Sequence, residues 1–169
     1  WASNGEAAMV ASTASVACIV AFMALHTLGG RYAYSNVPYD DWARALAGTS
    51  FRVSAQGGHR NCLYEGEAGR FRTRPDLIVR QGEKIALIID TKWKRMAPRI
   101  DDPKQGVSQA DVYQLMAYGQ LYDCPTVMLL YPHHGSLPPD PVRQQYSIAV
   151  KGAVETLIVG TQDLGGTLR

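Results

Sequence analysis

The sequence predicts an α/β domain with a mixed central β-sheet flanked by helices. Three observations lead to this fold class. Residues 85–89 form a continuous apolar run, which is typical of a central strand covered on both faces. Residues 108–122 place apolar side chains at helical spacing, as an amphipathic helix does. Residues 126–131 form a second buried strand that Pro132 ends.

The remaining elements are predicted from local patterns. Pro38 suits the first turn of a helix that Gly48 would end. Residues 51–55 alternate between apolar and polar side chains, as a half-buried strand does. A strand is predicted over 71–80, a turn over 81–84 and a loop over 96–107. Tyr146 to Val150 is predicted as the last strand, followed by a tail that frays after Gly160.

The predicted helix over 108–122 has a capping signal at its start. Ser108 can cap the first turn, and Asp111 is a weaker form of the capping-box acid three residues later. The apolar face then includes Leu115 and Gly119.

Composition indicates a globular domain with its own core. The chain has 169 residues, of which 46% are hydrophobic and 19% are charged, and its net charge is +2. This charge is too small to indicate a nucleic-acid partner by itself. Much of the positive charge gathers within residues 70–104, which predicts a basic surface around an acidic centre. The alternative is a set of solvated strand edges and loops.

Two features bear on domain organisation and cellular compartment. Residues 1–37 contain the apolar segment 7–28, interpreted as a buried helix or helix pair, with a membrane segment as the alternative left open. Residues 38–169 form the predicted catalytic domain. The three cysteines, Cys18, Cys62 and Cys124, show neither CxxC nor zinc-type spacing, which favours reduced thiols in a cytoplasmic protein.

Asp76, Asp90 and Lys92 are the candidate catalytic residues. A turn centred near Gly82-Glu83 pairs residues whose numbers sum to about 165 or 166, so Asp76 and Asp90 face each other across two strands. Strand alternation places Asp90 and Lys92 on the same face. We therefore expect the three side chains to converge on one point.

Two carboxylates this close repel unless a cation lies between them. Mg²⁺ suits such a site because it takes one or two carboxylates together with water and phosphate oxygens, and the carbonyl of Thr91 could add a ligand. The metal would polarise a phosphodiester, and Lys92 would position a water or offset developing charge. The alternative is a surface hairpin whose charges merely form salt bridges.

The motifs Arg74-Pro75-Asp76 and Ile89-Asp90-Thr91-Lys92 resemble the PD-(D/E)xK nuclease superfamily. The stretch 111–118 (DVYQLMAY), followed by Leu129-Leu130-Tyr131-Pro132, is similar to McrC, the nuclease subunit of the McrBC modification-dependent restriction system. The resemblance implies a restriction-endonuclease-like fold and Mg²⁺-dependent cleavage of double-stranded DNA, with Mn²⁺ as a substitute. It also implies an McrB-type, GTP-dependent AAA+ partner that recognises modified cytosine.

The resemblance further implies that Asp76 and Asp90 bind metal, that Lys92 is catalytic and that Gln114 supports the site. Tyr118 would share Gln114's helix face. McrC-like chains also carry a Phe-Glu pair before the first core strand. Here that pair is absent, and Glu6, Asp40 and Asp41 are unmatched candidates for a further acidic ligand.

Two other functions stay open at this point. One is a free-standing nuclease of DNA repair or recombination, and the other is a non-catalytic module that binds DNA or a partner through a degenerate site. Trp93 is expected to pack beside the strand end, with base stacking as the alternative. His133 and His134 are expected to be solvated loop residues.

Overall fold

The computed structural model describes residues 43, 46–96, 104, 106–140, 142–148 and 154–162. Several predictions lie outside these residues: the apolar segment 7–28, the start of the helix at Pro38, most of the loop 96–107, and the acidic candidates Glu6, Asp40 and Asp41.

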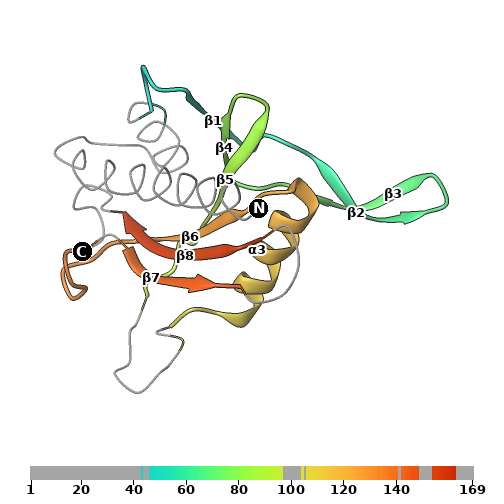
Figure 1. Cartoon of the computed structure of the whole chain (residues 1–169). Helices are drawn as coiled ribbons and strands as arrows, with labels where there is room; N and C mark the ends of the chain where they lie inside the picture. Colours follow the sequence, from blue (N-terminus) through green and yellow to red (C-terminus); the bar gives the residue numbers. More distant parts are fainter. Residues whose placement is uncertain are drawn as a thin grey trace, which may run out of the picture.

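The centre of the molecule is a mixed six-stranded sheet with the order β1-β4-β5-β6-β8-β7 (Figure 1). Strands β1, β4 and β5 are antiparallel neighbours, β5, β6 and β8 are parallel, and β7 returns antiparallel on the other edge. The predicted mixed sheet is therefore confirmed. The strands are β1 (Phe51–Ala55), β4 (Leu77–Gln81), β5 (Lys84–Thr91), β6 (Thr126–Pro132), β7 (Val142–Ser147) and β8 (Thr156–Gln162).

Helix α3 (Gln109–Tyr122) makes the crossover between the parallel strands β5 and β6 and lies against both. Among the described residues it is the one helix whose two ends are both defined, and it closes one face of the sheet over Ile88, Val127 and Leu129. The other face buries a second cluster that includes Leu87 and Ile89. A Cβ added at Gly119 would lie 2.1 Å from Val154, so this glycine allows α3 to approach the sheet closely.

A bulge in the β4–β5 hairpin sets the register of the candidate residues. Gln81 pairs with Lys84 and Arg80 with Ile85, but the register shifts between Arg80 and Val79, and Val79 pairs with Leu87. One extra residue in β5 therefore changes the pairing by one position. Continued one step beyond the Leu77–Ile89 pair, the shifted register brings Asp76 opposite Asp90, as predicted.

A second hairpin, β2 (Arg60–Glu65) with β3 (Ala68–Thr73), forms its own two-stranded sheet and projects from the body of the molecule (Figure 1). This hairpin was not predicted from the sequence. The single strand predicted over 71–80 is wrong, because β3 ends at Thr73 and β4 starts at Leu77 in another sheet. Pro75 lies between them and has no N–H to donate to a ladder.

The carboxyl-terminal strands also differ from the prediction. Strand β7 spans Val142–Ser147 rather than 146–150, and it is not the last strand. Strand β8 follows, and all its residues are buried, including those after Gly160 that were expected to fray. The pairing of β8 with both β6 and β7 overrides the weak strand propensity of Gly160. No helix within the described residues is long and apolar enough to cross a membrane.

Candidate active site

Asp90 is a buried carboxylate near the carboxyl end of a central strand. It pairs with Leu129 of β6, and its exposed fraction is 4%. Burial raises the pKa of Asp90 above its ordinary value, and the nearby charges of Asp76 and Asp111 act in the same direction, while Lys92 opposes them. A carboxylate held in this way is typical of a functional site, although structural ion pairs also perturb pKa values.

Lys92 follows β5 directly and extends its ladder. Its backbone N–H donates to the Leu130 carbonyl at 2.9 Å. The side-chain Nζ lies 2.5 Å from Asp90 Oδ2 and 3.4 Å from Asp111 Oδ1. Burial alone would lower the pKa of Lys92, but the two carboxylates outweigh burial, so its pKa is raised. Lys92 is therefore a fixed ammonium in the ground state of the site.

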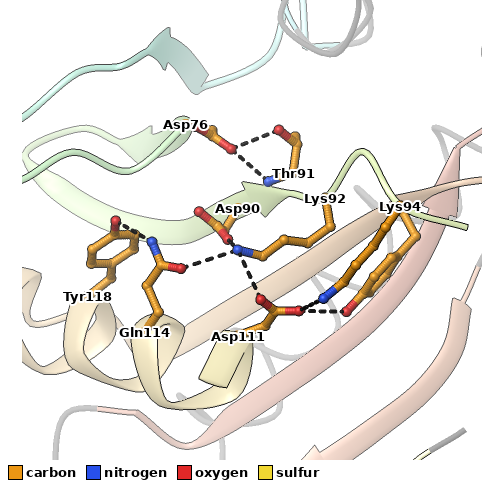
Figure 2. A network of polar contacts seen from close by, with 9 residues as sticks. Asp76, Asp90, Thr91, Lys92, Lys94, Asp111, Gln114 and Tyr118 are labelled. Carbon is orange, nitrogen blue, oxygen red and sulfur yellow. Dashed lines mark hydrogen bonds and ion pairs between the residues drawn. The ribbon is translucent and has the colours of Figure 1, made fainter. Parts of the chain in front are cut away.

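Helix α3 supplies a neutral contact to the same ammonium. Lys92 Nζ donates to Gln114 Oε1 at 3.2 Å, and Gln114 Nε2 donates to the Tyr118 hydroxyl at 2.8 Å (Figure 2). The two helix residues are one turn apart, so they lie on one face, as expected. Tyr118 is buried, and its hydroxyl fixes the amide that in turn holds Lys92.

Asp111 belongs to the same network, although the sequence analysis assigned it to helix capping. Its Oδ2 lies 2.5 Å from Lys94 Nζ and accepts a hydrogen bond from the Tyr131 hydroxyl at 3.4 Å. Burial alone would raise its pKa, but Lys94 and Lys92 outweigh burial and lower it. Helix α3 does begin after Ser108, but the serine side chain makes no capping hydrogen bond. The expected capping box is therefore wrong.

The sequence signal for Asp111 was its spacing from Gln114. Residues three positions apart on a helix share a face, so an acidic residue at position 111 lies beside whatever Gln114 contacts. No such signal existed for Tyr131, which comes from β6 and reaches the network only through the sheet register.

Asp76 takes a position beside the network rather than within it. Its Oδ2 accepts hydrogen bonds from the backbone N–H of Thr91 at 2.8 Å and from the Thr91 hydroxyl at 2.7 Å. In Figure 2 the contacts between Asp76 and Thr91 lie apart from the contacts that join Lys92 to Asp90, Asp111 and Gln114. Of the three side chains expected to converge, Asp90 and Lys92 form an ion pair. Asp76 makes its hydrogen bonds to Thr91, and its charge is still close enough to raise the pKa of Asp90.

A divalent cation such as Mg²⁺ needs oxygen donors, and the site offers carboxylates. Asp90 Oδ2 is buried, and no described hydrogen-bond donor is aligned with it, although Lys92 lies at ion-pair distance. No described cluster of three or more His, Cys, Asp or Glu side chains could hold a metal. Mg²⁺ does not need three, because it binds proteins through one or two carboxylates plus water and phosphate oxygens. The Asp76 and Asp90 carboxylates are oxygen donors of the type that such a cation binds.

The other candidates fall outside the network. Trp93 is 54% exposed and lines a small pocket with Tyr131 and Pro132 at the strand end. His133 Nδ1 lies 3.0 Å from the Thr161 hydroxyl, and His134 Nε2 lies 2.9 Å from the Met96 carbonyl. The two histidines are partly buried and engaged with protein groups, rather than being solvated as expected.

Comparisons with known proteins agree with this architecture. The family described as McrBC 5-methylcytosine restriction system component matches residues 41–132 of this chain. A comparison with curated proteins gave no match. A solved structure also resembles it: a refined half-complex from the tetradecameric assembly of Thermococcus gammatolerans McrB AAA+ hexamers with bound McrC. The TM-score is 0.52 and the identity is 14%, with 79% of this chain and 29% of that chain covered. At this identity the likeness concerns the fold.

Proposed function

This chain belongs to the family of McrBC 5-methylcytosine restriction system components, and from this premise we propose that it carries the endonuclease site of such a system. The proposed reaction is Mg²⁺-dependent hydrolysis of DNA phosphodiesters, with Mn²⁺ as a substitute. The proposed fold is that of the PD-(D/E)xK nucleases. The proposed partner is an McrB-type, GTP-dependent AAA+ subunit, since the similar structure contains McrB AAA+ hexamers with bound McrC.

The buried Asp90–Lys92 pair is the observation that carries this proposal. A surface hairpin with incidental salt bridges would leave both groups in water, but the Asp90 and Lys92 side chains are only 6% and 16% exposed. Removing charges from water is unfavourable unless they are paired, so their burial favours a functional role over a structural one. Asp76, opposite Asp90, completes the acidic pair.

Each residue then has a proposed role. Asp76 and Asp90 would hold the cation, with the Thr91 carbonyl as a further oxygen donor, and the bound metal would polarise the phosphate and acidify a water. Lys92 would orient that water or stabilise charge developing on the phosphate. Gln114 would keep the ammonium aimed at this point through its 3.2 Å contact with Nζ. Thr91 would hold the Asp76 carboxylate in place through its two donors.

The proposal is tested by separating metal binding from cleavage. In calorimetry with Mn²⁺, the wild-type chain should give a binding signal that Asp90→Ala abolishes. Asp140→Ala removes an exposed carboxylate elsewhere and should leave the signal unchanged. If the wild-type chain binds no metal and cuts no DNA when an McrB-type partner and GTP are supplied, the endonuclease assignment fails.

A further inference from the structure

The β2–β3 hairpin carries large apolar side chains that are not buried in the protein. Its large apolar side chains are exposed: Leu63 by 58%, Tyr64 by 67% and Phe71 by 74%. Three large exposed apolar side chains on one short hairpin exceed the single scattered ones that a soluble surface ordinarily carries. Arginines also outnumber glutamates over 60–74, the charged residues being Arg60, Glu65, Glu67, Arg70, Arg72 and Arg74.

The base of the hairpin is fixed to the body of the protein. The Thr73 hydroxyl lies 3.2 Å from the Tyr122 hydroxyl of α3, and the Arg60 guanidinium lies 5.0 Å from the Tyr122 ring centroid. Arg60 also donates to the Leu121 carbonyl. The hairpin is therefore an anchored arm rather than a loose loop, and its outer half extends beyond the sheet (Figure 1).

The arginine side of this arm faces away from its anchor. Arg72 pairs across the strands with Asn61, and Arg70 pairs with Leu63, so these residues share one face. The Thr73–Arg60 pair, which contacts α3, lies on the opposite face. The Arg72 side chain forms no hydrogen bond or ion pair with any described residue. Arg70 pairs with Glu65 at 3.0 Å, but both side chains are mostly exposed, so water screens this contact.

Phe71 lies between these arginines in a strained conformation. Its φ is 50°, in the left-handed region that bulky residues rarely adopt. Folding and solubility gain nothing from an exposed ring held in this way. Strained backbone of this kind clusters at ligand contacts.

We propose that the β2–β3 hairpin is a DNA-contacting arm of the candidate active site. Arg72 and Arg70 would bind backbone phosphates from one face of the arm, and Phe71 together with Tyr64, which the register places on the other face, would lie against sugars or base edges. Arginines and exposed aromatic side chains on one projecting arm fit the phosphates and apolar groups of a DNA duplex. Position favours the same partner, because only Arg74 and Pro75 separate the end of β3 from Asp76. This inference rests on the proposed endonuclease function.

The test measures DNA binding apart from cleavage. The full chain is titrated into a fluorescein-labelled DNA duplex in EDTA, and anisotropy is followed over a series of salt concentrations. Arg72→Gln should weaken binding several-fold and flatten the slope of log K against log salt by about 0.9, the value for one lost phosphate contact. Phe71→Gly should weaken binding about tenfold, as loss of one aromatic–base contact does.

The controls carry matched changes away from the hairpin. Arg52→Gln removes an exposed arginine on β1, and Tyr113→Ala removes an exposed aromatic residue on α3. Both should bind the duplex like the wild-type chain. Circular dichroism should show that every variant is folded.

The outcomes separate this inference from the endonuclease proposal. If hairpin variants bind DNA like the wild-type chain while Asp90→Ala abolishes cleavage, the hairpin does not contact DNA and the endonuclease proposal is retained. If hairpin variants lose DNA binding but the wild-type chain never cleaves, the hairpin contacts DNA and the endonuclease proposal is wrong. If hairpin variants keep DNA affinity but lose an AAA+ partner in a pull-down, the arm is a protein-docking surface and the inference is overturned.

Discussion

The candidate site and the β2–β3 hairpin depart from ordinary packing in opposite ways. At the site, charged groups are buried: Asp90 is 4% exposed and lies 2.5 Å from Lys92. On the hairpin, apolar groups are exposed, with Phe71 at 74%. Only Arg74 and Pro75 lie between the end of β3 and Asp76. A folding domain gains stability from neither arrangement.

The contrast suggests that stability and function are divided between neighbouring segments. The two apolar clusters on either face of the sheet hold β4, β5 and β6 in register. This rigid support allows Asp90, Lys92 and Asp111 to remain close despite their desolvation. The hairpin contributes little to either cluster, so its surface is free to carry groups suited to a ligand. Each prediction below tests one side of this division.

The largest expected effect comes from the two lysines that follow β5. Lys92→Ala should lower DNA cleavage by about 10³-fold while Mn²⁺ binding persists, because Asp76 and Asp90 remain. Lys94→Ala removes the same charge two residues later, where Nζ contacts Asp111 but is 49% exposed, and should change cleavage by no more than about tenfold. Single-turnover cleavage rates measure both. Equal losses of cleavage rate in the two variants would contradict a special role for Lys92.

Asp111 provides a smaller test of the buried network. Asp111→Asn removes a carboxylate from beside both lysines but keeps the shape of the side chain. Lys92 retains Asp90 and Gln114, so we expect cleavage to fall by about tenfold, equivalent to about 1.4 kcal/mol. Because Asp111 helps to raise the pKa of Lys92, the alkaline limb of the pH–rate profile should also move to lower pH. An unchanged profile would show that Asp111 serves only the fold.

The contacts of this network that the sequence predicts are those fixed by a local pattern, such as a short turn or the period of a helix. The Asp76–Asp90 pairing came from turn arithmetic, since a short hairpin fixes its register locally. The bulge between Val79 and Arg80 decided which of two adjacent registers the hairpin adopts beyond it. Local sequence gives little indication of a bulge. The Gln114–Tyr118 pair followed from helix periodicity. The Thr91 bonds to Asp76 did not, because they depend on side-chain rotamers at a strand end.

Two elements were missed for a different reason. The segment 60–70 has no regular apolar alternation because it packs against little, so a pattern based on burial cannot find it. Strand β8 was missed because Gly160 and the residues around it resemble a flexible tail. Pairing with strands on both sides stabilises it, and those partners are distant in the sequence.

Acidification offers a further test of the buried carboxylate. Protons compete with metal for Asp90, and burial raises its pKa above the ordinary value of 3.8. Mn²⁺ affinity should therefore begin to fall at a higher pH than an exposed aspartate would give. In Asp111→Asn the fall should move to lower pH, because Asp111 is one of the charges that raise the pKa of Asp90. Calorimetric Kd values over a pH series measure this. If Mn²⁺ affinity falls at the pH expected for an exposed aspartate, Asp90 is not desolvated in solution.

The smallest expected effect lies on the hairpin, where a substitution should raise stability. Phe71→Gly should increase the free energy of unfolding by about 0.5–1 kcal/mol, because glycine adopts a φ near 50° without strain and an exposed ring contributes little packing. Phe71→Ala removes the ring but keeps the Cβ, so it should not stabilise the protein. Urea denaturation of the two variants separates backbone strain from ring exposure. Destabilisation by Phe71→Gly would show that the ring supports the fold, and the division between a stable core and a ligand-adapted arm would then be wrong.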